Sequence, residues 1–259
     1  MATLRTHLYS GLIPSASATA RTRYRTVHFR QGDLDGSMLA CSVFSALALM
    51  RLASAADVQT LSGPVGSQLR EAFARSPDLF FHGGFDEDLV ELLDVFGGTI
   101  RYEACSGSMR TVRKFALERL ASDQLIILQL GVESVRAKLS RDIGSYWVVA
   151  VGTEVVVASG APVVTSILCL DPDEEAPVIA PFNARLDLES PSRAARYQHY
   201  RTSTKRLWPM TCVSAFALSR SGDRRTARGP AIRAGPPEAR SPAAECSGST
   251  RSSDAARWR

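Results

Sequence analysis

The segment Ser37–Met50, "SMLACSVFSALALM", has no charged residue, and its apolar side chains cover nearly the whole circumference of a helix. A helix that is apolar all round has to be covered by other elements on several sides. The segment is also too short to cross the hydrocarbon of a bilayer, which needs about 20 apolar residues. The helical pattern continues to Ser54, so we predict a buried central helix over Ser37–Ser54, with a globular domain packed around it.

The other elements are predicted from hydrophobic periodicity and turn residues. Amphipathic patterns predict helices over Pro64–Arg75, Phe85–Phe96 and Ser108–Ala121, and a short strand over Thr99–Ala104. Apolar, β-branched runs bounded by turn residues predict strands over Gln124–Leu130, Tyr146–Ser159 and Val163–Asp171. Helices followed by antiparallel strands predict an α+β fold, in which an N-terminal helical half with the buried central helix packs on a mainly antiparallel sheet half.

The composition predicts three regions along the 259 residues. Residues 1–26 are expected to form a loosely ordered leader, and residues 27–218 one domain of ordinary size. Of residues 220–259, 31 of 40 are Arg, Ala, Ser, Gly or Pro, which is too little apolar surface to order a segment. We therefore predict a disordered tail over residues 219–259. Two origins remain open for it: a native basic arm, or GC-rich DNA read out of frame.

The net charge of +5 resides entirely in that tail. Residues 220–259 contain nine arginines and four acids, which leaves residues 1–219 neutral. Binding to nucleic acid is therefore not expected of the domain, and would have to come from the tail. Only three lysines accompany 28 arginines, a bias that we attribute to GC-rich codon usage and a bacterial source.

The cysteines and histidines exclude several kinds of site. The five cysteines are widely spaced without a CxxC pair, and none of the four histidines is paired at short spacing. We therefore expect no disulfide framework, no metal or other cofactor, and a reducing, cytoplasmic location. The apolar stretch Trp147–Leu170 is interrupted by Glu154, Gly160 and Pro162, so it predicts strands and no membrane span.

Three short motifs lie in an order that suggests a known fold. Gln31-Gly32 precede the central helix, Tyr146-Trp147 begin a valine-rich strand, and Asp171 ends the next strand. This order resembles the papain-like cysteine peptidases over about residues 26–218. It is closest to the compact bacterial type that includes the double-glycine leader-processing peptidases. The resemblance implies a papain-like fold with a peptide-binding groove between its two halves.

The resemblance assigns a role to each matching position. Gln31 matches the glutamine that helps to form the oxyanion hole, and Asp171 matches the residue that orients the catalytic imidazole. Met38 stands where the nucleophilic cysteine is expected, and Leu39 where a glycine follows it. Tyr146 stands where the histidine base is expected. Two elements of the catalytic machinery are thus kept and two are replaced.

The two replacements remove the chemistry of the family. A cysteine peptidase needs a thiolate, and the thioether of Met38 has no proton to lose. The base has to exchange a proton near neutral pH, whereas a tyrosine ionises at a pKa of about 10. We therefore predict a pseudopeptidase that binds a peptide or protein partner in the former active-site groove. Gln31, Met38, Tyr146 and Asp171 would surround this groove, and Trp147 would contact the partner.

Alternative interpretations of the same residues remain open. Gln31 and Asp171 could each be ordinary turn residues. Ser37 precedes Met38, but a serine nucleophile needs a base, and no histidine lies near the Tyr146 strand in sequence. An active cysteine peptidase or acyl transferase would need a relocated nucleophile, for which Cys41 is the candidate, with His199 as its base. A third possibility is a protein that associates with nucleic acid through the basic tail.

Overall fold

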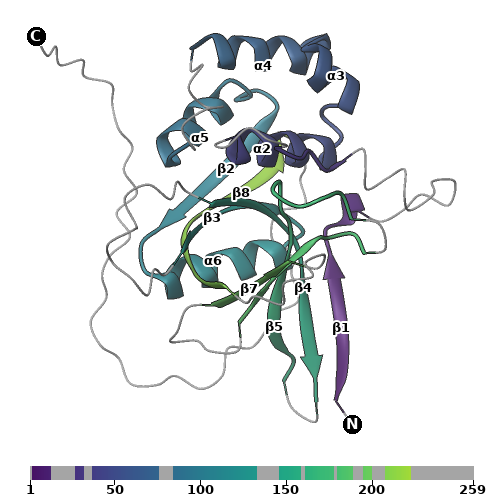
Figure 1. The fold of residues 1–259 in the computed structure, drawn as a ribbon, viewed down its shortest axis with the longest axis vertical. Helices are drawn as coiled ribbons and strands as arrows, with labels where there is room; N and C mark the ends of the chain where they lie inside the picture. The colour runs from purple at the N-terminus through teal and green to yellow at the C-terminus, as the bar shows by residue number, and fades with distance from the viewer. Residues whose placement is uncertain are drawn as a thin grey trace, which may run out of the picture. The chain divides into compact units, whose positions relative to one another are not determined.

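The computed structural model of the chain is shown in Figure 1. It describes residues 2–12, 27–31, 37–75, 84–132, 146–158, 161–177, 180–188, 195–199 and 208–222, with the backbone alone at 132, 195–199 and 208. The chain divides into two units, Met1–Arg228 and Gly229–Arg259, and every described residue belongs to the first.

The described residues form an α+β fold. Its helices are the short 3-10 helix η1 (Ser10–Leu12), then α2 (Met38–Leu49), α3 (Ala55–Thr60), α4 (Gly63–Arg75), α5 (Asp86–Asp94) and α6 (Met109–Ala121). Its strands are β1 (Thr3–Leu8), β2 (Ile100–Ser106), β3 (Leu125–Val132), β4 (Tyr146–Val157), β5 (Val163–Leu170), β6 (Ala184–Asp187), β7 (Ala195–His199) and β8 (Trp208–Arg220).

All eight strands join one antiparallel sheet. Pairing runs from β4 through β3, β8, β7, β6 and β5 and returns to β4, so these six strands close on themselves. β1 pairs with the C-terminal half of β4, and β2 pairs with β8. β4 is therefore paired on both sides by β3 and β5 at Val149 and Ala150, and its first residue, Tyr146, pairs with Leu130 of β3.

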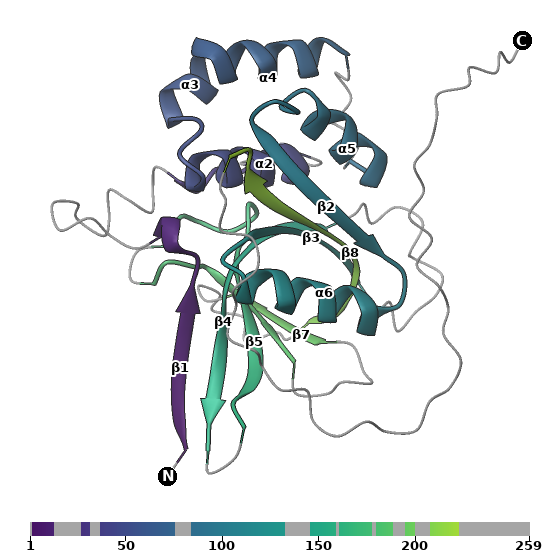
Figure 2. The same cartoon turned by 180° about the vertical axis from the view of Figure 1, so that it is seen from behind.

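Two apolar clusters occupy the two faces of this sheet. The first joins α2, α4 and α5 to one face of β3, β4 and β8, and includes Leu39, Leu47 and Trp147. The second joins α6 to the opposite face, and includes Val148 and Cys169. Figures 1 and 2 show the same division, with α2 to α5 gathered near one end of the strands and α6 against the curved sheet.

The predicted burial of the central helix is confirmed, because all twelve residues of α2 are buried. The helix ends at Leu49, however, and the prediction that it reaches Ser54 is wrong. Arg51 has a left-handed backbone with φ +56°, and the Leu52 N–H donates to the Leu47 carbonyl at 2.9 Å. This pairing across a left-handed residue is a common way to end a helix.

Seven other predicted elements are confirmed to within a few residues: α4, α5, α6, β2, β3, β4 and β5. α3 was not predicted, although Ser54 and Asp57 form a capping box at its start. β6, β7 and β8 were not predicted either. β8 mixes small, polar and apolar residues, and such a sequence lacks the alternation of a half-buried strand.

The predicted loosely ordered leader is wrong for its first part. Residues 3–8 form β1, which pairs with β4 from Thr3 opposite Val157 to Leu8 opposite Gly152. The two backbones approach closely, since a Cβ atom added at Gly152 would lie 2.3 Å from the His7 carbonyl oxygen. The exposed strand has no buried face, and its sequence therefore shows no apolar alternation. Residues 13–26 lie outside the described part of the chain.

The predicted end of the domain at Leu218 is also too early. β8 continues to Arg220, which pairs with Ile100 at the start of β2. The predicted disorder of residues 223–259 falls outside the described residues. Among the helices of the described residues, none is both long and apolar enough to span a membrane.

Candidate functional site

Gln31 is held between the central helix and the loop that follows β5. Two residues before it, the Phe29 N–H donates to Ser45 Oγ of α2 at 3.0 Å, and the Phe29 ring packs edge-to-face on Phe44 at 5.8 Å. The Gln31 N–H then donates to the Pro172 carbonyl at 3.0 Å. The segment before α2 is thereby brought to the loop that follows β5.

Tyr146 and Asp171 form a direct hydrogen bond. Tyr146 Oη donates to Asp171 Oδ2 at 2.6 Å, and Asp171 is completely buried. Burial and, secondarily, the Asp171 carboxylate raise the pKa of the Tyr146 hydroxyl above its usual value. Tyr146 therefore stays protonated at neutral pH and serves as a hydrogen-bond donor, without the capacity to accept a proton as a base.

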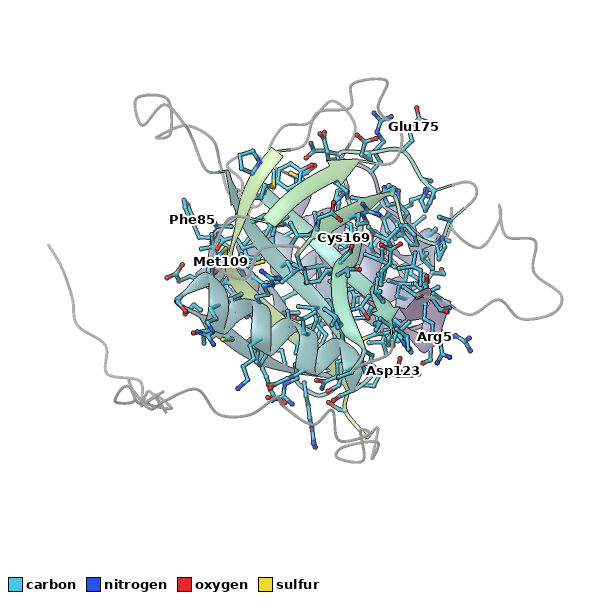
Figure 3. All side chains as sticks on the ribbon, turned by 90° about the horizontal axis from the view of Figure 1, so that it is seen from below. Arg5, Phe85, Met109, Asp123, Cys169 and Glu175 are labelled. Atoms are coloured by element: carbon cyan, nitrogen blue, oxygen red, sulfur yellow. The ribbon has the colours of Figure 1, made fainter. Side chains whose placement is uncertain are left out.

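The backbone and carboxyl group of Asp171 are fixed by further contacts. Its Oδ1 accepts from the Asp173 N–H at 2.9 Å. The Asn183 side chain accepts from the Asp171 N–H at 2.7 Å and donates to its carbonyl at 3.0 Å, and His28 Nε2 donates to the same carbonyl at 2.8 Å. Figure 3 labels Cys169, which lies in the interior before this turn, and Glu175, which lies at the outer edge after it. Asp171 is therefore rigidly placed.

The side chain of Gln31 joins the same network. Its Nε2 donates to Asp173 Oδ1 at 3.0 Å, and the Asp173 N–H bonds Asp171. Gln31 Oε1 is buried and accepts no hydrogen bond from a described residue. Three of the predicted site residues, Gln31, Tyr146 and Asp171, thus lie in one hydrogen-bonded cluster. One N–H of the Gln31 amide is engaged with Asp173, and the second N–H of the same NH2 group is the donor that an oxyanion would use.

Met38 is the first residue of α2 and is 8% exposed. One turn further along the helix, Ser42 Oγ donates to the Trp147 carbonyl at 3.2 Å, which fixes α2 against the beginning of β4. Met38 belongs to the apolar cluster against which Tyr146 packs. Met38 and Tyr146 therefore border the same large apolar core, and the two side chains are a thioether and a phenol where the resemblance expects reactive groups.

Cys41 lies in an environment that opposes its role as a relocated nucleophile. Its side chain is buried on α2, and its Sγ lies 4.0 Å from Ser37 Oγ. Burial raises the pKa of the thiol to about 11, and the hydrogen bond with Ser37 acts in the opposite direction but to a smaller extent. At neutral pH the thiolate that a nucleophile requires is scarce. The side chain of His199, the proposed base of this alternative, lies outside the described residues.

Trp147 was predicted to contact a bound partner, and the structure corrects this prediction. Its side chain is completely buried, and its Nε1 donates to the Gly84 carbonyl at 2.8 Å. The ring also packs against Phe216 at a centroid distance of 6.2 Å. A large aromatic ring with a satisfied N–H is an ordinary core residue. Trp147 therefore ties α5's preceding loop to the sheet and leaves no surface for a partner.

Sequence reasoning missed His28 and Asn183, which hold Asp171 in place. His28 is buried, and burial lowers its pKa even though the bond to the Asp171 carbonyl acts in the opposite direction. Asn183 Nδ2 lies 3.1 Å from His28 Nε2 and also donates to the Glu175 carbonyl at 3.1 Å. Both residues act mainly on backbone groups, and such contacts leave no spacing or motif in a sequence.

A cavity of about 540 Å³ lies on the same face of the sheet, between α5 and β2. Gln129 of β3 lies directly opposite both Trp147 and Ser214, so Ser214 is two strands along from Trp147, and its partner Asp86 lines the cavity. Ser214 Oγ donates to Asp86 Oδ1 at 2.7 Å, and burial raises the pKa of this carboxyl. The lining of the cavity combines acidic and apolar side chains, and includes Asp86, Glu87, Val90, Glu91, Asp94 and Phe216.

A metal centre finds no support in the described ranges, where no three His, Cys, Asp or Glu side chains are grouped so as to bind an ion. Comparison with known proteins gives no relative from which a role could be carried over. No family model matches the sequence, and no curated protein matches it significantly. Any functional assignment therefore rests on the residues and their geometry.

Proposed function

We propose that the chain is a papain-like peptidase homologue that has lost its nucleophile and base and acts by binding a peptide or protein partner. The observation that carries this proposal is the hydrogen bond from Tyr146 Oη to the buried Asp171 Oδ2 at 2.6 Å. In papain-like peptidases the matching pair is an imidazole and the carboxyl or amide group that orients it. Here the second partner is kept, and the first is a phenol.

Two further features support this assignment. Gln31 reaches the same cluster through Asp173, and Met38 begins a buried helix that is bonded to the start of β4. Their order along the chain, and the attachment of Gln31 to the loop after β5 and of α2 to the start of β4, support descent from a papain-like ancestor. The competing peptidase that uses Cys41 is disfavoured, because a buried thiol with a pKa of about 11 is a poor nucleophile.

A binding role is favoured over catalysis because the hydrogen-bonded cluster of Gln31, Tyr146 and Asp171 is in place, while the nucleophile and the base that the resemblance expects are missing. The partner would approach the edge formed by Gln31, Met38 and the loop after β5, with Trp147 supporting it from the core. The cavity beside Asp86 lies on the same face and offers additional room for a bound segment. We place the protein in the bacterial cytoplasm, a location supported by widely spaced cysteines without a disulfide framework.

Restoring the missing groups tests whether positions 38 and 146 face each other. The key variant combines Met38→Cys with Tyr146→His, and its matched control combines Met38→Cys with Tyr146→Phe. An imidazole beside the new thiol should lower the thiol pKa by at least about one unit from the usual value of about 8.5. The first variant should then react with iodoacetamide at pH 6.5 roughly tenfold faster than the control. The wild-type rate is subtracted for the five native cysteines.

The reactivity of the thiol is a better measure than peptide cleavage. Leu39 stands where the family has a glycine, and its side chain could block a substrate even when the thiol is activated. Rate–pH curves for the two variants that superimpose, with an ordinary thiol pKa in both, would show that residues 38 and 146 are not neighbours. The papain-like assignment would then be withdrawn.

A further inference from the structure

β1 is an edge strand with both faces open to solvent. Residues Thr3 to His7 are exposed, and the side chain of Leu4 is 59% exposed. Within the described part of the chain, β1 pairs with β4 and with no other strand. Figures 1 and 2 show it as the outermost strand on its side, and Arg5 lies at the periphery in Figure 3. An open edge of this kind is a template for pairing with another strand.

The hydrogen-bond pattern shows which residues of β1 face outward. The Tyr9 N–H donates to the Val151 carbonyl at 2.8 Å, and Tyr9 continues the β1 register beyond Leu8 opposite Gly152. Hydrogen-bonded and non-bonded pairs alternate along an antiparallel ladder. Residues 3, 5, 7 and 9 therefore direct their N–H and C=O groups toward β4, while residues 4, 6 and 8 direct theirs to the open edge. The position of the His7 carbonyl near Gly152 agrees with this assignment.

We propose that two copies of the chain associate through antiparallel pairing of their β1 strands about a two-fold axis at Thr6. The outward-facing N–H and C=O groups of residues 4, 6 and 8 must pair with the outward-facing groups of the same three residues in the partner strand. The register with the greatest overlap places Thr6 opposite Thr6 and Leu4 opposite Leu8. It forms roughly six backbone hydrogen bonds, one from each outward N–H of both strands.

The side chains of β1 suit this self-pairing. The apolar Leu4 meets the apolar Leu8, and the β-branched Thr6 meets its own copy, which are favourable cross-strand pairs. Arg5 faces His7 across the axis and does not face its own copy, so no two arginines are opposed. A six-residue strand pair buries little area, so we expect a weak dimer with a Kd on the order of 100 µM.

A charge exchange at position 6 tests both the dimer and its register. Sedimentation equilibrium of the wild-type chain should show the mass rising with concentration from 28.0 kDa toward twice that value. Thr6→Glu places two carboxylates opposite each other and Thr6→Lys two ammonium groups, so each variant alone should associate at least about fivefold more weakly. An equimolar mixture of the two should associate at least as tightly as the wild type.

A backbone variant separates strand pairing from other contacts. Thr6→Pro removes an outward N–H and leaves the ladder to β4 intact, so it should abolish association while the melting temperature changes little. Thr6→Ala keeps that N–H and should still form the dimer. A wild-type chain that is monomeric at all concentrations would overturn the proposal. So would a Thr6→Pro variant that dimerises normally, or a Glu and Lys mixture that associates no better than each variant alone, which would indicate another surface or register.

Discussion

The bond between Tyr146 and Asp171 makes a quantitative prediction about stability. Tyr146→Phe removes the hydroxyl that donates to Asp171 Oδ2 at 2.6 Å, and the buried carboxyl group cannot replace this donor with water. A hydrogen bond to a charged group contributes about 1.5–3 kcal/mol, and an acceptor left unsatisfied costs a comparable amount. Because Asp171 Oδ1 keeps its bond from the Asp173 N–H, we expect the lower part of the combined range, about 2–3 kcal/mol.

A double-mutant cycle isolates the pair from other effects of each substitution. Urea unfolding at pH 7 would be measured for the wild type, Tyr146→Phe, Asp171→Asn and the double variant. The coupling free energy should be about 1–2 kcal/mol. Tyr102→Phe is a matched control, because Tyr102 Oη donates to Asp94 at 2.9 Å on the exposed surface. Solvent replaces that bond, so the control should lose less than about 1 kcal/mol.

The outcome that refutes the reasoning is a small effect at the buried pair. A loss below about 0.5 kcal/mol for Tyr146→Phe, together with a coupling near zero, would mean that the hydroxyl does not bond the carboxyl in solution. The proposed correspondence with an imidazole and its orienting group would then lose its main support. Loss of the same size at Tyr102 and Tyr146 would likewise contradict the predicted difference in burial.

Three further predictions concern the core, the edge strand and the buried histidine. Phe44→Ala should lower the free energy of unfolding by about 3–5 kcal/mol in urea, because the ring is buried between two aromatic partners. Gly152→Ala should cost about 1–3 kcal/mol because its Cβ would meet the β1 backbone, whereas Gly98→Ala, with nothing within 4 Å, should be nearly neutral by the same measurement. Burial lowers the pKa of His28, so the unfolded state binds a proton at a higher pH than the folded state. The free energy of unfolding should therefore fall as the pH drops below about 6.5. His28→Gln should flatten this fall in urea titrations between pH 7 and 5. A Phe44→Ala variant as stable as wild type, equal losses for the two glycine variants, or an unchanged pH slope would each contradict the corresponding argument.

The elements that could be predicted are those whose burial is one-sided or complete. α2 has no charged residue and could only be buried, and β3 and β4 have apolar runs that a sheet between two layers requires. The elements that could not be predicted do not depend on such a pattern of buried side chains. β1 is exposed on both faces and depends on backbone pairing with β4, and such pairing does not select side chains.

In the candidate site, too, the residues that could be predicted act through their side chains, and those that were missed act mainly on backbone groups. Gln31, Tyr146 and Asp171 were predicted to lie together from their order along the chain, and they form one hydrogen-bonded cluster. Asn183 and His28 complete the cluster through contacts with the Asp171 backbone, which no motif records. The predicted contact of Trp147 with a partner failed for a related reason, because an aromatic residue in a motif can equally be core.

The chemistry of the cluster explains how the proposed loss of catalysis can be tolerated by the fold. A buried carboxyl group at Asp171 requires a donor wherever the imidazole of an ancestor is missing, since an unpaired buried acceptor is destabilising. Tyr146 supplies that donor, and its raised pKa keeps the proton on the phenol at all physiological pH values. Met38 likewise fills the start of α2 with an apolar side chain, where a lone thiol would have no imidazole to ionise it. Under the proposed function, both replacements would satisfy the packing and hydrogen bonding of the ancestral site while removing its reactivity. In this proposal the site is preserved by the stability of the domain, and binding is the function left to it.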